Sequence, residues 1–218
     1  EGLISSMDNH NTMIEQYSII EENVENIITQ LYENPVITTK DIKTLQRISN
    51  GMAFLNNLAT KESYEIPLAI GDKVTNVNVT ILRNTEEAGK VDISINSENL
   101  GKVNVNFSIK KEGLKGFITC DNRNGLDTLK SYEDRIKQSI LQEGIEVKQM
   151  NYGMENKTKS INNLKISGSF LQGDKTFIEN SDTLVEPQEA KTSTEILYKT
   201  AKTFLIQIRN IEMESIQK

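Results

Sequence analysis

The apolar positions of this chain change their spacing several times, and each change marks a different kind of secondary structure. In residues 14–31 and again in 42–58 they recur three and four positions apart. This spacing is the stripe of an amphipathic helix, so the pattern predicts two helices. Asn34-Pro35 separates them, and residues 38–41 (Thr-Thr-Lys-Asp) are typical of a capping box. Such a short connection predicts an antiparallel helical hairpin within residues 1–62.

The middle of the chain alternates apolar and polar residues, which is the period of a strand with one buried face. The alternation occupies five runs, namely 64–68, 77–81, 91–95, 103–109 and 114–120. Helical spacing then returns between residues 126 and 143, and the alternation resumes at Ile145 and Val147. Residues 63–154 are therefore expected to form about six strands and one helix. The fold class is α+β, with an antiparallel or mixed sheet and one helix packed on it.

Glycines mark the turns of this region. Glu112-Gly113 suits a tight hairpin between two strands, and Gly144 suits the left-handed residue that closes a helix, with Ile145 packing back on its last turn. Either Asn122 or Asn124 is a candidate N-cap for the same helix. Gly144 and Ile145 are therefore assigned structural roles as turn and cap.

The end of the chain, residues 190–218, has nearly heptad spacing. Its apolar residues lie four, three, four and three positions apart, namely Leu197, Ala201, Phe204, Ile208 and Ile211, after a capping sequence at residues 192–195. We expect this helix to pack with the N-terminal helices into a helical subdomain, although the same seam could form a coiled coil or a homo-oligomer. Residues 155–189 are interrupted by glycine and proline and are expected to form an irregular connection with room for one hairpin.

One segment of the sheet region, Val91 to Tyr152, resembles a known family. Residues 97–103 (Ser-Glu-Asn-Leu-Gly-Lys-Val) precede a hairpin, a helix and residues 141–147 (Leu-Gln-Glu-Gly-Ile-Glu-Val). This order resembles the C-terminal domain of flagellar hook-length control proteins, with its Pro-Glu-x-Leu-Gly-x-Val and Leu-x-x-x-Gly-(Ile/Leu)-x-(Val/Leu) patterns. Ser97 replaces the usual proline, and the long Pro- and Gln-rich segment of the family has no counterpart among the 218 residues, which contain three prolines.

The resemblance implies binding without chemistry. Hook-length control proteins are substrates of the flagellar type III export apparatus, and their C-terminal domain contacts the cytoplasmic domain of the export switch protein to change export from hook to filament subunits. By resemblance, the partner-binding surface would lie around Leu100, Gly101 and Val103, and the protein would be found in the bacterial cytoplasm or exported through the flagellar apparatus. Leu100 and Gly101 are equally explained as a buried anchor and a turn. The alternative is a structural or oligomerisation protein that uses the terminal heptad helices.

The composition of the chain argues against several other classes of function. A net charge of −6 and a pI near 5.1 argue against a nucleic-acid binder, and no apolar run approaches the roughly 20 residues that span a membrane. His10 is the single histidine and Cys120 the single cysteine, so neither a His-based triad nor a His-rich metal site can be assembled. We therefore expect no catalytic residue, metal or cofactor and no enzyme, with an unrecognised carboxylate or metal-assisted site as a third hypothesis. The chain begins with Glu1 rather than Met, which is compatible with a fragment of a longer protein.

Overall fold

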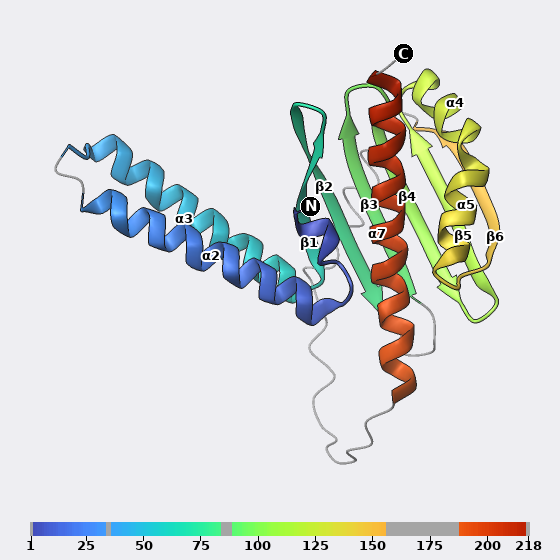
Figure 1. Ribbon diagram of the computed structural model, residues 1–218, viewed down its shortest axis with the longest axis horizontal. Coiled ribbons are helices and arrows are strands. Elements are labelled where there is room, and N and C mark those ends of the chain that lie inside the picture. Colours follow the sequence, from blue (N-terminus) through green and yellow to red (C-terminus); the bar gives the residue numbers. More distant parts are fainter. Residues whose placement is uncertain (1, 34–35, 84–88, 156–187, 217–218) are drawn as a thin grey trace, which may run out of the picture.

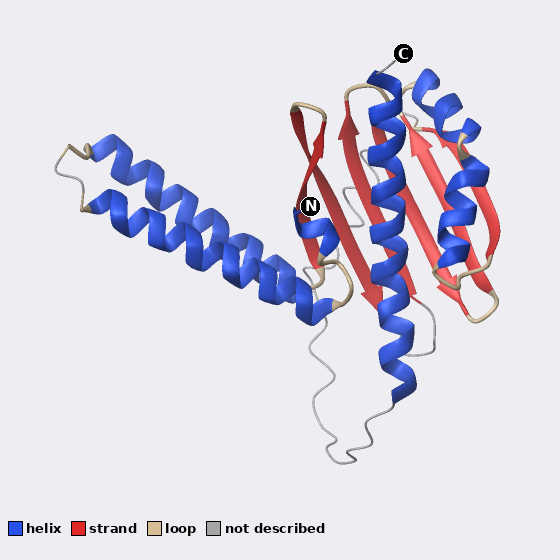
Figure 2. Cartoon of the chain, viewed as in Figure 1, coloured by secondary structure: helices blue, strands red, loops and turns tan. Residues whose placement is uncertain are grey.

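The computed structural model describes residues 2–33, 36–83, 89–155 and 188–216. These residues form a six-stranded mixed sheet and a set of helices, which confirms the α+β class (Figures 1 and 2). The connection predicted over 155–189, with its hairpin, lies almost entirely outside the described residues. The division of the chain into four domains stays a prediction.

The strands follow one another across the sheet in sequence order. Each strand is antiparallel to its neighbour except the last, which is parallel to the strand before it; the strands are β1 (Ser63–Ile70), β2 (Lys73–Arg83), β3 (Gly89–Ser97), β4 (Gly101–Lys110), β5 (Gly113–Cys120) and β6 (Val147–Met154). The six strands occur where the alternation predicts them, and the turn at Glu112 lies between β4 and β5 as expected. The parallel β6 follows from the helices between it and β5, because a crossover helix returns the chain to the starting end of the sheet.

Register places one kind of side chain on each face of the sheet. The odd-numbered residues of β2, β3 and β4 that point inward are buried valines, isoleucines and a phenylalanine. The opposite face carries rows of polar residues, one of which runs directly across five strands through Glu65, Asn78, Ser94, Asn104 and Thr119. The sheet therefore has one core face and one polar face.

Helices from three parts of the chain cover the core face (Figure 1). α1 (Gly2–Ser5) lies near β1, α4 (Arg123–Ser131) and α5 (Glu133–Gln142) lie over β5 and β6, and α7 (Gln188–Ile216) crosses the middle of the sheet. The single helix predicted between 126 and 143 is in fact two, because Tyr132 leaves the helical conformation with φ −100° and ψ 9°.

α7 does not pack as its spacing predicts. It packs mainly on β1, β2, β3, α1 and α5 rather than in a bundle with the N-terminal helices, and it begins at Gln188, upstream of the predicted cap. The reason is the width of its apolar stripe, which includes Tyr198 and Leu205 beside the heptad positions and fits a flat sheet better than a narrow helical seam. The Phe204 ring meets Phe107 of β4 edge to face, with ring centroids 5.2 Å apart.

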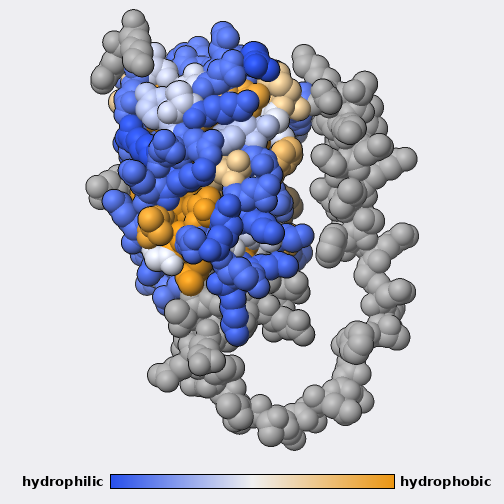
Figure 3. All heavy atoms as spheres, turned by 90° about the vertical axis from the view of Figure 1, so that its right-hand side faces the viewer, coloured by the Kyte–Doolittle hydropathy of each residue, from blue (hydrophilic) through white to orange (hydrophobic). Residues whose placement is uncertain are grey.

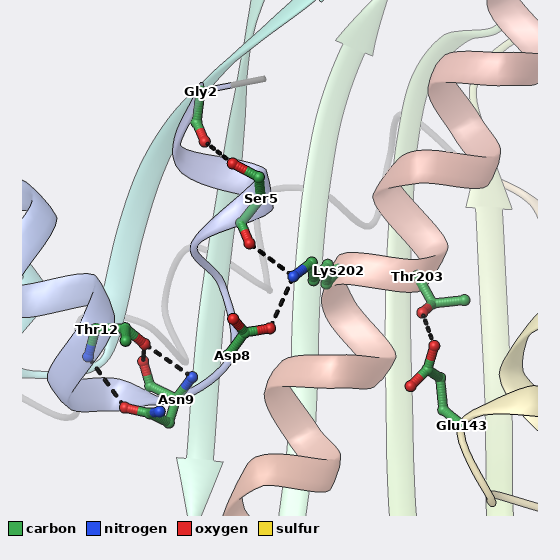
Figure 4. Close-up of polar contacts among 8 residues, drawn as sticks. All are labelled: Gly2, Ser5, Asp8, Asn9, Thr12, Glu143, Lys202 and Thr203. Carbon is green, nitrogen blue, oxygen red and sulfur yellow. Dashed lines mark hydrogen bonds and ion pairs between the residues drawn. The ribbon is translucent and has the colours of Figure 1, made fainter.

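Polar contacts hold α7 at both sides (Figure 4). The Lys202 ammonium donates to the backbone oxygen of Ser5 at 2.6 Å and to the Asp8 carboxylate at 2.7 Å. On the other side, the Thr203 hydroxyl donates to Glu143, which follows α5, at 3.3 Å. α7 therefore joins the first residues of the chain to the β5–β6 crossover.

The predicted N-terminal hairpin is confirmed. α2 (His10–Tyr32) and α3 (Thr39–Thr60) begin with capping boxes at Asn9 and Thr38 and project away from the β1 edge of the sheet (Figure 1). A cluster of tyrosines attaches the base of the hairpin: Tyr17 donates to the Glu65 backbone oxygen at 2.7 Å, and the Tyr64 and Tyr198 hydroxyls lie 2.7 Å apart. This cluster joins α2 to β1 and α7.

Candidate functional site

The turn that joins β3 to β4, residues 97–101, contains most of the family-like sequence. Gly101 has φ +76°, in the left-handed region that favours glycine. A Cβ atom at this position would lie 2.4 Å from the Asp121 carboxylate and 2.8 Å from the Asn122 Cβ. Glycine is therefore required here both by the backbone conformation and by the close approach of the segment that follows β5.

A carboxylate from the far end of the chain completes the turn. Glu212 of α7 is 1 % exposed, and it accepts hydrogen bonds from the Ser97 hydroxyl, from the Asn99 amide at 2.8 Å and from the Leu100 backbone N–H at 3.2 Å. A buried carboxylate is costly unless donors surround it, and here the turn supplies three. Glu212 therefore fixes the conformation of the turn against α7.

The end of β5 and the start of α4 hold the other side of the same turn. The Cys120 thiol donates to the Leu100 backbone oxygen at 2.8 Å, and burial raises the pKa of this thiol, which keeps it protonated and able to donate. The Asn122 side chain, which also caps α4, donates to the Asn99 backbone oxygen at 3.2 Å. A Cβ atom on Gly125 would lie 2.1 Å from the Leu100 oxygen, so α4 packs directly on the turn backbone.

The predicted site residues lie mainly inside the molecule. The side chains of Leu100, at 1 % exposure, and Val103 are buried, and Gly101 is half-buried. Their role in partner binding stays a prediction, and a direct contact through Leu100 or Val103 would require the core to open. Glu98 and Asn99 are the exposed residues of the turn.

The two residues assigned to the end of the helix lie elsewhere, in the connection between α5 and β6. Gly144 has φ +82° and follows the end of α5, and Ile145 is buried in the core. This geometry is that of a glycine that ends a helix. The pair therefore positions the start of β6.

Glu212 and Gly125 were not among the residues expected at this site. Glu212 follows Ile208 by four positions and Ile211 by one, which places a carboxylate on the apolar stripe of a predicted helix. A charged residue in that position is the sequence signal that could have pointed to a buried polar partner. Gly125 carries no comparable signal, since glycine near a helix start is common.

The site contains hydrogen-bonding groups rather than reactive ones. Among the described residues, no three His, Cys, Asp or Glu side chains lie close enough together to hold a metal ion. In the same part of the chain, no helix has the length and apolar character needed to cross a membrane. The arrangement favours a rigid, preformed surface.

Comparison with protein families decides what the segment resembles. Residues 80–160 match the family model of the flagellar hook-length control protein FliK. The match confirms the resemblance seen in the sequence and extends it from β2 to just beyond β6, so it includes the whole turn and both crossover helices. Searches of curated proteins and of solved structures gave no match. The FliK-like segment covers less than half of the chain, and α7, which completes its core, lies outside it.

Proposed function

We propose that this chain is a protein-interaction module that binds the cytoplasmic domain of the flagellar export switch protein and so helps to change export specificity. The FliK match indicates a hook-length-control-like role, and it is the observation that carries the proposal. The matched strands and helices form one continuous sheet-and-helix unit with a shared core, as a binding module requires. In such a role the protein works in the bacterial cytoplasm and passes through the flagellar export apparatus.

The β3–β4 turn is the part of the unit best suited to recognition. Glu212, Cys120 and Asn122 hold its backbone in place, while Glu98 and Asn99 are exposed. A loop that is already ordered loses little conformational entropy on binding. Contact with the turn would stabilise the switched state of the partner if that state binds the turn more tightly than the unswitched state does.

A binding measurement with a charge reversal tests this proposal. The purified chain is titrated calorimetrically with the cytoplasmic domain of the export switch protein from the same organism. We expect binding in the micromolar range, and Glu98→Lys is expected to weaken it about tenfold, which corresponds to about 1.4 kcal/mol. Glu112→Lys makes the same charge change in the exposed β4–β5 turn at the other end of the sheet, and this control is expected to bind as the unaltered chain does.

Two results would count against the proposal. If no heat of binding appears at tens of micromolar (about −6 kcal/mol or weaker), the chain does not act through the switch protein. If Glu98→Lys and Glu112→Lys weaken binding equally, the effect comes from net charge and the turn is not the recognition surface.

Oligomerisation through the terminal helices is the second candidate function, and the structure changes which helices could serve it. The seam of α7 is buried on the sheet, so it offers no surface for a coiled coil. The α2–α3 hairpin, in contrast, exposes several large apolar side chains. Self-association through the terminal helices would therefore use the hairpin rather than α7.

A further inference from the structure

The α2–α3 hairpin buries little of its own apolar surface. In α2 the buried residues are Met13, Tyr17 and Ile28, and in α3 they are Leu45 and Ala59. Met13, Tyr17 and Ala59 belong to the core at the base of the hairpin, which leaves Ile28 and Leu45 as the buried residues of its outer part. Most of the stability of a helix in a protein comes from packing of its apolar face, so a partner that covers the rest of these stripes would stabilise both helices.

Three of the exposed apolar residues of the hairpin, Ile27, Leu31 and Ile48, lie on one side of it. Leu31 and Thr44 line the same shallow hollow of about 350 Å³ near the outer end of the helices. Ile27 lies one turn before Leu31, and Ile48 lies one turn after Thr44, so the helical repeat places both on this side. Ile27, Leu31 and Ile48 are 56 %, 41 % and 46 % exposed.

Half-buried residues continue both rows toward the base of the hairpin. Ile20 precedes Ile27 by seven positions, and Leu55 follows Ile48 by seven, which is the spacing of residues on one helical face. We call the surface formed by Ile20, Ile27, Leu31, Ile48 and Leu55 the apolar side of the hairpin.

The side of the molecule that carries α5 and β6 is mostly hydrophilic, with small hydrophobic areas (Figure 3).

We propose that the apolar side binds the same surface of a second copy of this chain, so that two hairpins form a four-helix bundle. The available area fits such a dimer. Helices of 23 and 22 residues are about 35 Å long and about 10 Å wide each, so one side of the hairpin offers about 700 Å². A standard stable interface uses about 800 Å² of each partner.

The two helices of the hairpin carry opposite net charge. α2 contains four glutamates and no lysine or arginine, whereas α3 contains three basic residues and one aspartate. A twofold axis along the bundle places each α2 beside the α3 of the partner, so helices of opposite charge are neighbours and every adjacent pair is antiparallel. A surface that pairs with itself in this way needs no other protein to cover it.

The mass of the chain in solution tests the dimer. Light scattering after gel filtration at about 50 μM is expected to give twice the 24.6 kDa of the monomer, since an interface of this size binds in the micromolar range or tighter. The double variant Ile27→Glu with Ile48→Glu places carboxylates on the apolar side, and it is expected to be monomeric with unchanged far-ultraviolet circular dichroism.

A matched double variant serves as the control. Ile19 and Phe54 are also exposed, but by the helical repeat they point away from the neighbouring helix and off the apolar side. Ile19→Glu with Phe54→Glu is expected to remain dimeric. A monomeric unaltered chain, or two double variants with the same mass, would overturn the proposal. The pairing does not involve the β3–β4 turn, so this result is independent of binding to the switch protein.

Discussion

The sheet with its covering helices and the α2–α3 hairpin are both built from amphipathic elements, but they differ in how completely those elements are covered. In α7, every apolar residue from Leu197 to Ile211 is buried except the outward-facing Ile206. In the outer part of the hairpin, one residue of each helix is buried. The same spacing of apolar residues thus predicts a helix in both regions but does not say how well that helix is packed.

The difference follows from what each stripe meets. A sheet is flat and wide, so it can cover a broad stripe along its whole length. Two helices alone touch along a narrow line, so the edges of their stripes stay exposed. The free energy of unfolding of the sheet region should therefore depend strongly on single core residues. The α2–α3 hairpin should tolerate single substitutions as long as the hairpin of a second copy covers it.

The largest expected effect comes from the centre of the sheet core. Phe204→Ala removes a fully buried ring that packs on Phe107, and it is expected to lower the free energy of unfolding by about 3–5 kcal/mol. Urea denaturation followed by circular dichroism measures the loss. Leu45→Ala in the hairpin, beside the open hollow, is expected to cost about 2 kcal/mol, the low end for such a change. Equal losses for the two variants would mean that the hairpin is as well packed as the sheet core.

The hydrogen bonds of Glu212 should give the next largest effect. Glu212→Ala leaves the Leu100 N–H and the Asn99 amide without this acceptor, and it is expected to cost about 1–3 kcal/mol. Hydrogen exchange of the Leu100 amide should accelerate by more than that of the Ile28 amide in α2. Glu212→Gln keeps one acceptor oxygen and should lose less stability than the alanine variant. If the two variants are equally stable, the carboxylate does not hold the turn.

The smallest predicted effect concerns the tyrosines that join the two regions. Burial raises the pKa of Tyr17 and of Tyr198 to about 12, and it also raises the pKa of Tyr64. Because the folded pKa values exceed the unfolded value of about 10, this stabilisation is complete below about pH 10 and is lost as the pH rises toward 12. Absorbance at ultraviolet wavelengths should show a phenol titration near pH 12 that decreases in Tyr198→Phe. Ionisation of every tyrosine near pH 10 in the folded protein would contradict the buried cluster.

Local features of the fold could be predicted from the sequence because each depends on neighbouring residues. The alternation of Val77, Val79 and Ile81 specifies a strand and its buried face, and Thr38 with Asp41 specifies a helix start. The sequence left the direction of β6 open, because alternation of apolar and polar residues does not distinguish a parallel strand from an antiparallel one. The break at Tyr132 was also missed, because an aromatic residue at that position fits a continuous helix equally well.

The candidate site was predicted in part. The sequence indicated that residues 97–103 matter, and it left open whether Leu100 and Gly101 form an anchor and a turn or a binding surface. The structure gives them the anchor and turn geometry, but this depends on Glu212, Cys120 and Gly125, which lie 20 to 112 residues from Leu100 in the sequence. Contacts across such separations carry no local pattern, so they could not be predicted.

The bond between Ser97 and Glu212 also has a consequence for the order of events during protein synthesis. These residues are 115 positions apart, and contacts of such separation form late because a long loop must close first. At synthesis rates of about 5–20 residues per second, the ribosome needs several seconds to add α7 after β3 has been made. Throughout that interval the strands lack the helix that covers their centre, so the nascent chain presents its apolar sheet face to chaperones before it can complete its fold.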